Sequence, residues 1–208
     1  MSRRSRGILL VVLGLFLLLA GTGLYFTYER QDELAGKSSG ILLQELEREI
    51  KFSPPQESLP LPERNPAQEQ EEDPEPVVPT RTLSGYDLMG ILRIPNLGIE
   101  LPVLSTWSYS LLNVAPCRYS GSVETGDLVI LGHNYRSHFY ALKQAAVGDT
   151  VEFTDAGGVT HRYVVAEVEI IGGSESGKLP SDYPLTIFTC TSDSRHRIVV
   201  RCAALDGV

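Results

Sequence analysis

The chain has few cysteines and no excess of positive charge, and each absence excludes a class of protein. Its 208 residues include three cysteines, Cys117, Cys190 and Cys202. Three are too few for a disulfide framework, and an odd number leaves at least one thiol free. The formal net charge of -8 argues against a general nucleic-acid binder, because phosphate contacts require clustered Lys and Arg. The free thiol is either reactive or a buried, inert residue.

Charged residues are absent from the run Gly7 to Phe26, GILLVVLGLFLLLAGTGLYF. About 20 apolar residues, at roughly 1.5 Å each, span a bilayer core of about 30 Å. Three arginines precede the run and predict a short cytoplasmic N-terminus at 1–6. We therefore expect an uncleaved, single-pass transmembrane signal-anchor at 7–28, with the rest of the chain on the extracellular, cell-wall side of the cell membrane.

A cleaved signal peptide is the alternative interpretation of this run. Its apolar region would be only roughly 7–15 residues long and would be followed by a small-x-small cleavage site. Here the run is longer, and Ala20-Gly21-Thr22 lies inside it rather than after it. The length of the run therefore favours the signal-anchor.

Aromatic residues are absent from 53–80, where proline and glutamate dominate. This composition predicts a stiff, extended and disordered stalk. Before it, ILLQELEREIK at 41–51 has apolar residues at helical spacing and predicts a short juxtamembrane helix. We interpret 29–80 as an extracellular spacer that holds a domain at 81–208 clear of the membrane. That domain is long enough to have its own core.

The domain at 81–208 has apolar residues in short runs bounded by turn residues. Seven runs have strand character: 89–95, 98–105, 127–134, 150–154, 161–171, 185–190 and 196–200. Short helices are predicted only at 108–114 and 138–145. Seven or eight short strands indicate a mostly β fold, either a barrel or a sandwich, and the cost of exposed strand edges favours a closed barrel.

Three side chains of the predicted sheet form a candidate site. Cys190 closes the run LTIFTC, Arg197 opens the run HRIVV, and His133 follows the buried run at 127–131. A thiol beside a fixed cation is the setting in which cysteine becomes a nucleophile. With an imidazole nearby, the trio suits acyl transfer: the thiolate attacks a carbonyl, the imidazole moves the proton, and the guanidinium stabilises the oxyanion or orients the substrate. A structural cysteine with a surface histidine is the alternative.

The choice among the arginines near the second strand depends on alternation. If side chains alternate from His196, then Arg197 and Arg201 share one face of the strand. Arg197 lies closest to the end of the strand at Cys190, so we prefer it. Arg195, in the preceding turn, is the alternative candidate for the arginine of the site.

Several motifs together resemble the sortase family. They are Leu-Gly-His-Asn at 131–134, Thr-Ile-Phe-Thr-Cys at 186–190, His-Arg-Ile-Val-Val at 196–200, GILRIPNLGIELPV at 90–103 and the segment at 148–153. They follow the family's order, behind an N-terminal anchor of the family's usual kind. The resemblance implies a closed eight-stranded sortase-type β-barrel with one or two short helices, and a cysteine transpeptidase (a hydrolase of the thiol-protease type) of Gram-positive surfaces.

By position, the resemblance implies a role for each residue of the site. Cys190 is the nucleophile that cleaves an LPXTG-like sorting signal between Thr and Gly through a thioester. His133 is the general acid and base, Arg197 holds the substrate backbone or the oxyanion, and Thr189 lines the substrate groove. An amine from a peptidoglycan cross-bridge or a pilin lysine releases the thioester. No cofactor is expected, and the carboxylates form no recognisable calcium loop.

The subclass and the rival functions stay open at this point. Segment 172–184 is too short for the class B insertion, and no second span or Asp-Pro-aromatic lid is visible, which disfavours the pilin-polymerising class C. A class D-like or housekeeping enzyme remains, with a pilin-joining sortase or a membrane-tethered domain that only binds peptides as alternatives. Two other families of cysteine enzyme fit less well. L,D-transpeptidases need a Ser-His-Gly-Cys motif, whereas His196 lies after Cys190 here. Papain-like proteases place the cysteine before the histidine, which is the opposite of the order of His133 and Cys190.

The remaining cysteines and histidines receive structural predictions. Cys202 is expected in the core and Cys117 near the surface. His138 is expected in a loop and His161 on a strand surface. A metal site that combines His133, His138 and a cysteine is disfavoured, because a five-residue step between the histidines suits no tight ligand pair.

Overall fold

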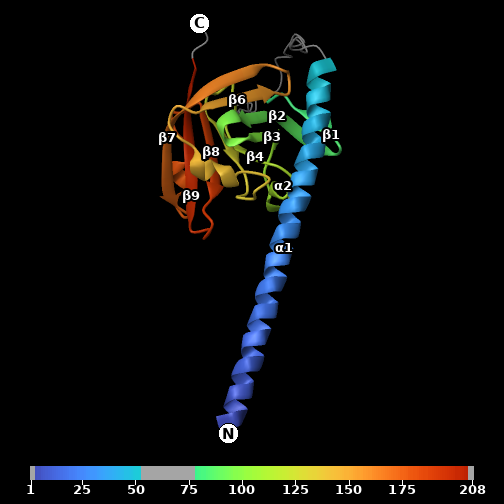
Figure 1. The fold of residues 1–208 in the computed structure, drawn as a ribbon. Helices are drawn as coiled ribbons and strands as arrows, with labels where there is room; N and C mark the ends of the chain where they lie inside the picture. The colour runs from blue at the N-terminus through green and yellow to red at the C-terminus, as the bar shows by residue number, and fades with distance from the viewer. Residues whose placement is uncertain (1–2, 53–77, 206–208) are drawn as a thin grey trace, which may run out of the picture.

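The computed structural model describes residues 3–52 and 78–205. One long helix, α1 (Arg3–Phe52), precedes a β-rich domain. The C-terminal half of α1 lies along one side of this domain, and its N-terminal half projects away from it (Figure 1). Most of the predicted stalk, residues 53–77, lies outside the described residues.

The domain is a closed β-barrel. Strands run in the order β1-β2-β3-β4-β5-β8-β9-β7-β6, and a further pairing of β2 with β6 closes the sheet. The three residues of β1 pair only with β2, so eight strands make the barrel, as predicted. The bounds are β1 Arg81–Leu83, β2 Tyr86–Ile94, β3 Ile99–Leu104, β4 Cys117–Ser120, β5 Leu128–Leu131, β6 Thr150–Asp155, β7 Thr160–Gly172, β8 Leu185–Cys190 and β9 His196–Ala204.

The short helices lie between the strands. The two predicted ones are present as α2 (Tyr109–Leu112) and η2 (Tyr140–Gln144), and two 3-10 turns, η1 (Pro95–Leu97) and η3 (Ser176–Lys178), were not predicted. Strand β4 was also missed. Its sequence, CRYS, is short and has no apolar alternation, and it is a strand because β3 and β5 pair with it on either side.

The cysteines other than Cys190 belong to the interior. Cys202 is fully buried in the barrel core, as predicted, but the prediction for Cys117 was wrong: it is fully buried too, in β4 between the barrel and α1. Its thiol donates a hydrogen bond to the carbonyl of Ala115 at 3.3 Å. Burial raises the pKa of both thiols to about 12, because it disfavours the thiolate. Cys190 is the half-buried thiol of the three.

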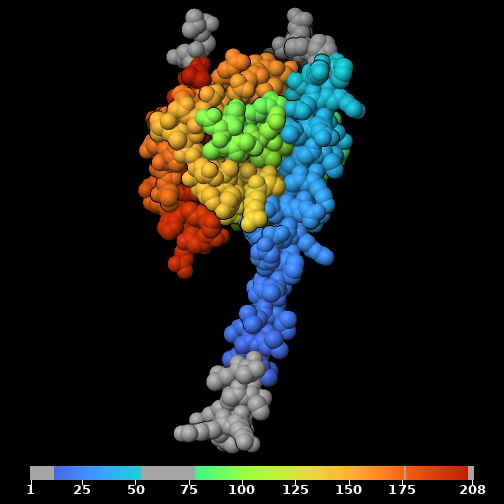
Figure 2. Space-filling view, in the orientation of Figure 1, coloured from blue at the N-terminus to red at the C-terminus, as the bar shows by residue number. Residues whose placement is uncertain are grey.

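Helix α1 is one continuous helix, in contrast to the anchor, spacer and short helix predicted separately. The predicted helix at 41–51 is its last part, and Leu42 and Leu46 are buried against Leu88 and Leu104 of the barrel. Figure 2 shows this half of α1 packed closely on the domain. Residues 29–52 are therefore packed on the barrel and do not form the first part of an extended spacer.

The other half of α1 is apolar and exposed. Large apolar side chains such as Leu18 and Phe26 have about two thirds of their surface exposed. Within the described residues, α1 is the one helix long and apolar enough to cross a membrane by length and composition. A 50-residue helix, at about 1.5 Å per residue, leaves a full bilayer thickness free beyond the barrel.

His138 lies in a turn, as predicted for a loop residue, but it is buried because it joins α1 to the barrel. It is 2% exposed, and its Nε2 lies 2.8 Å from the Oγ of Ser39. That hydroxyl also lies 2.8 Å from the carbonyl of Ala35 and 2.7 Å from that of Val114. Carbonyls only accept, so the hydroxyl donates to one of them and accepts the proton of Nε2. Nδ1 then carries a lone pair, and it has no partner among the described residues.

This buried histidine makes stability depend on pH. Burial, with His133 nearby, lowers the pKa of His138 to about 4 from its ordinary 6.5, while Asp32 and two carbonyls oppose the shift. As the pH falls, the unfolded chain therefore takes up this proton at a higher pH than the folded chain does. The free energy of unfolding then decreases as the pH drops below 6.5, the ordinary pKa of histidine. Between pH 7 and pH 5 the wild-type chain should lose about 2 kcal/mol more than a His138→Gln variant. Denaturant unfolding of both full chains in detergent measures this, and equal losses would contradict it.

Candidate active site

Three adjacent strands bring His133, Cys190 and Arg197 into one row. Strand β8 lies between β5, its parallel neighbour, and β9, its antiparallel neighbour. Leu131, the last residue of β5, pairs with Phe188, and His133 follows Leu131 by two residues as Cys190 follows Phe188. On the other side Cys190 pairs directly with Arg197. Directly paired residues project to the same face of a sheet with their Cβ atoms about 5 Å apart.

The three side chains line one pocket with a volume of about 160 Å³. Cys190 and Arg197 are partly exposed there. The rest of the lining is mainly apolar and comes from the β3–β4 connection, from β4, β5 and β8, and from the β7–β8 connection: Trp107, Tyr109, Leu112, Tyr119, Leu131, Gly132, Gly173, Leu179 and Phe188. The structure thus places the predicted thiol, imidazole and guanidinium around one opening.

Hydrogen bonds to β8 hold the backbone of Gly132, the residue before His133. The amide of Gly132 donates to the carbonyl of Phe188 at 3.2 Å, and the hydroxyl of Thr189 donates to the carbonyl of Gly132 at 2.8 Å. A Cβ on Gly132 would lie 2.4 Å from the ring of Phe139, so only glycine fits. Thr189 is 1% exposed and does not line the pocket. Its position therefore differs from the prediction, and its hydroxyl ties the ends of β5 and β8 together.

The arginines near β9 have different surroundings. Arg197 lines the pocket, and its Nη1 donates to the carbonyls of His196 and Ser194 at 3.1 and 3.4 Å. Arg201, although on the same strand face, is buried, with an ion pair to Glu169 at 2.6 Å. Arg195 is exposed in the turn and is not among the lining residues. Arg197 is thus the guanidinium that faces Cys190.

The electrostatics of the pocket favour a neutral imidazole. Burial lowers the pKa of His133, because the imidazolium loses solvation there. A neutral imidazole can accept a proton from a thiol or an amine and return it later. The ring of Tyr135 lies beside it, with centroids 4.7 Å apart and planes 34° apart.

The apolar wall of the pocket is aromatic and was not predicted. Trp107 stacks on Tyr119 with centroids 5.7 Å apart, and Tyr119 meets Phe188 edge-on at 5.4 Å. The signal in the sequence was the single tryptophan, placed in a polar segment just after a strand. Trp107 remains 42% exposed, which is typical of a surface that binds something.

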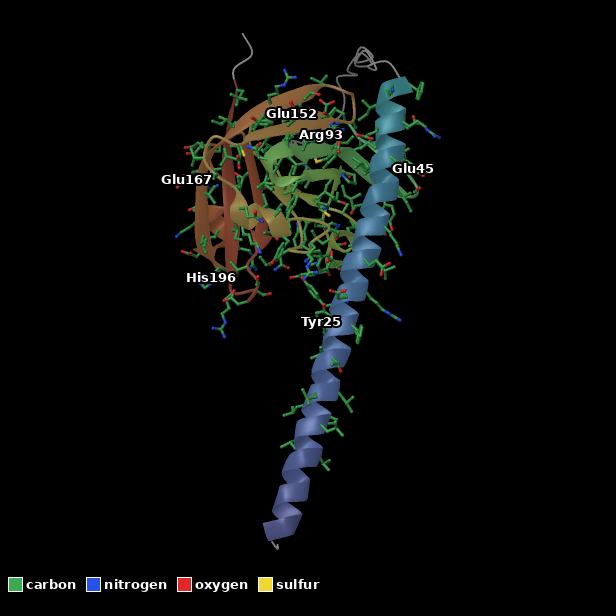
Figure 3. All side chains as sticks on the ribbon, viewed as in Figure 1. Tyr25, Glu45, Arg93, Glu152, Glu167 and His196 are labelled. Carbon is green, nitrogen blue, oxygen red and sulfur yellow. The ribbon has the colours of Figure 1, made fainter. Side chains whose placement is uncertain are left out.

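The other histidines have their own partners. His138 binds Ser39, and the Nε2 of His161 lies 2.9 Å from the carboxylate of Asp155. His196 is exposed at the start of β9, at the end of the barrel nearest the projecting half of α1 (Figure 3). Across 3–52 and 78–205, no group of three or more His, Cys, Asp or Glu side chains is arranged to hold a metal ion.

Comparison with known proteins identifies the fold. The family model of the sortase domain matches residues 92–205. The chain is similar to sortase A from Corynebacterium diphtheriae, with a TM-score of 0.53 and 23% identity over 59% of this chain and 63% of that one. It is also similar to the sortase D5 transpeptidase of Clostridium perfringens (TM-score 0.52, 20% identity, 58% and 80% covered) and to sortase C1 from Streptococcus agalactiae (TM-score 0.52, 25% identity, 58% and 69% covered).

These comparisons differ in what they establish. No curated protein matches the chain. The structural likenesses are at or below 25% identity and show the barrel, and the chain spans less than two thirds of the Corynebacterium protein. The family model, however, covers more than half of the sequence, including every strand that lines the pocket. The chain therefore belongs to the sortase family, whose members are cysteine transpeptidases.

Proposed function

We propose that this chain is a membrane-anchored transpeptidase that joins a surface protein to an amine through a thioester on Cys190. The observation that carries the proposal is the row of His133, Cys190 and Arg197 across β5, β8 and β9, at one pocket. Sortases act in general on surface proteins and on amine acceptors of the cell wall. An LPXTG-like sorting signal is the substrate expected here, and a peptidoglycan cross-bridge is the expected acceptor.

The first half of the reaction breaks the peptide bond. The neutral imidazole of His133 takes the proton of the Cys190 thiol, and the resulting thiolate attacks the carbonyl carbon of the Thr–Gly bond. The guanidinium of Arg197 stabilises the oxygen that becomes negative. As the tetrahedral intermediate collapses, protonated His133 gives its proton to the departing amine of glycine. The acyl group stays on sulfur as a thioester, and the glycine fragment leaves.

The second half forms the new amide. The acceptor amine attacks the thioester carbon, and the now neutral His133 takes the proton that the amine loses. The sulfur of Cys190 leaves and takes this proton back from His133, so the thiol and the neutral imidazole are restored. The apolar wall of Trp107, Tyr119 and Phe188 excludes water from one side of the thioester, which favours the amine as acceptor.

The exposed half of α1 supports a single-pass anchor. We propose that it crosses the cell membrane with the N-terminus in the cytoplasm, because Arg3, Arg4 and Arg6 precede the apolar run. The catalytic domain then lies on the outer side. The enzyme would be of the class D-like or housekeeping type, and a pilin-joining sortase or a domain that only binds peptides is the alternative.

The test uses the purified full chain in detergent with a small panel of LPXTG-type peptides and amine acceptors. The expected result is an amine-linked product cut after Thr, together with an acyl adduct on Cys190 seen by mass spectrometry. Amines of the cross-bridge type and a pilin-type lysine peptide distinguish the two acceptor classes. Peptide binding with neither product nor adduct would establish the binding-only alternative and refute the transpeptidase.

The choice between the two candidate arginines gives a matched pair of variants. Arg197→Ala should lower kcat/KM by about 10²- to 10³-fold, the effect of removing a donor to an oxyanion. Arg195→Ala removes the same charge from an exposed turn outside the pocket and should stay within about threefold of wild type, because surface charges are screened. Steady-state kinetics decides, and a larger loss for Arg195→Ala would reverse the assignment.

A further inference from the structure

Helix α1 packs against the segment that carries His133. We call residues 133–139 the histidine loop, and four side chains of α1 contact it. The carboxylate of Asp32 accepts from the amide of Ser137 at 3.0 Å and from its hydroxyl at 2.6 Å. The remaining contacts are Tyr28 with Tyr135, Glu29 with Arg136 at 3.6 Å, and Ser39 with His138 at 2.8 Å.

Tyr135 is the member of this loop that touches the imidazole of His133. Its ring is 7% exposed and lies 4.7 Å, centroid to centroid, from the imidazole. On its other side the edge contact with Tyr28 of α1 measures 5.9 Å at 78°. Its hydroxyl donates to Oδ1 of Asn113, at the end of α2, at 3.0 Å. The ring is thus held by α1 and by α2 while it faces His133.

Apart from the ring of Tyr135, the imidazole of His133 has few contacts that fix its orientation. Among the described residues, no hydrogen bond is made by its ring nitrogens, although a neighbouring carboxylate or carbonyl commonly orients such a base. Its backbone is fixed by Gly132 and Phe139, but rotation about the side-chain bonds is limited only by packing. An aromatic ring at 4.7 Å provides that packing, at a distance typical of offset rings.

We infer that Tyr135 is the positioning residue of His133, and that α1 supports it through Tyr28 and Asp32. The helix that anchors the chain thereby also shapes the active site. The catalytic meaning of this inference rests on the proposed function, whereas the positioning of the ring does not. The direction of the effect follows from geometry: without the Tyr135 ring, the imidazole gains rotational freedom and contact with water.

The test compares Tyr135→Ala, Tyr135→Phe and Tyr28→Ala in the full chain in detergent. Tyr135→Ala should lower kcat by about 10- to 100-fold with little change in KM, since misplacing a catalytic group costs up to about 10². Tyr135→Phe keeps the ring and loses only the bond to Asn113, so it should stay within about threefold of wild type. Tyr28→Ala should fall between them. Phe26→Ala, which removes an exposed aromatic ring of the same helix, is the matched control and should resemble wild type.

A second readout does not depend on turnover. NMR titration of the His133 ring should show its pKa rising toward the ordinary value in Tyr135→Ala, because hydration restores the imidazolium, and staying unchanged in Tyr135→Phe and Phe26→Ala. Lower thermal stability in Tyr135→Ala with an unchanged His133 titration and unchanged kcat would overturn the inference. A wild-type chain without transpeptidation would refute the proposed function, and the titration would still decide whether Tyr135 positions His133.

Discussion

The variant Cys190→Ala should lose transpeptidation down to the assay background, a fall of at least about 10⁴-fold, because no other group can carry the acyl chain. Cys117 and Cys202 cannot substitute for it. Both are fully buried, and burial keeps their thiols protonated with pKa values of about 12. The measurement is product formation together with intact-mass analysis for the thioester adduct.

The matched control for this prediction is Cys202→Ala. It removes one thiol from the core, so it should cost some stability while the adduct still forms. The two variants separate loss of the nucleophile from loss of a buried sulfur. An adduct that persists in Cys190→Ala would show that the wrong sulfur has been assigned.

The variant His133→Ala should lower kcat by about 10²- to 10⁴-fold, the usual contribution of a general acid and base. Both halves of the reaction should slow, because His133 protonates the departing glycine amine and later deprotonates the acceptor. Single-turnover experiments with and without amine distinguish the two steps. The thiol of Cys190 is still present, so a reactive alkylating reagent should still label it.

His196→Ala is the control for the histidine. This imidazole is exposed at the start of β9, one residue before Arg197, and it does not line the pocket. We expect its loss to change kcat by less than about threefold, in line with a surface substitution. If His196→Ala were as damaging as His133→Ala, the base would have to be sought on β9 instead of after β5.

The docking of α1 changes how the chain is arranged at the membrane. The spacer interpretation of residues 29–80 placed the domain at a distance from the predicted span. In the structure, Glu29 and Asp32 already contact the histidine loop, so the barrel begins directly after that span. His196, which precedes the pocket residue Arg197 in β9, lies at the end of the barrel nearest the projecting half of α1 (Figure 3). If the projecting half of α1 crosses the membrane as we propose, a substrate reaches Cys190 close to the membrane surface.

Most strands and the candidate site residues were predictable from the sequence. Runs such as LTIFTC and HRIVVR are short, rich in β-branched or aromatic residues and bounded by turn residues, and this local pattern favours a strand. Polar residues at the ends of these runs indicated His133, Cys190 and Arg197 as candidates, because the end of an apolar run locates the end of the predicted strand. Closure of the barrel followed from the number of strands and the cost of free edges.

Only the tertiary structure decided what surrounds these residues. Strand β4, buried Cys117 and buried His138 depend on partners far away in the sequence, and no local pattern encodes such contacts. The same holds for Thr189, whose hydroxyl turns inward to Gly132. The sequence by itself determined the long apolar helix, most of the strands and the candidate trio, because these follow from periodicity and residue type. The packing of α1 against the histidine loop was decided by long-range contacts between side chains about 100 residues apart.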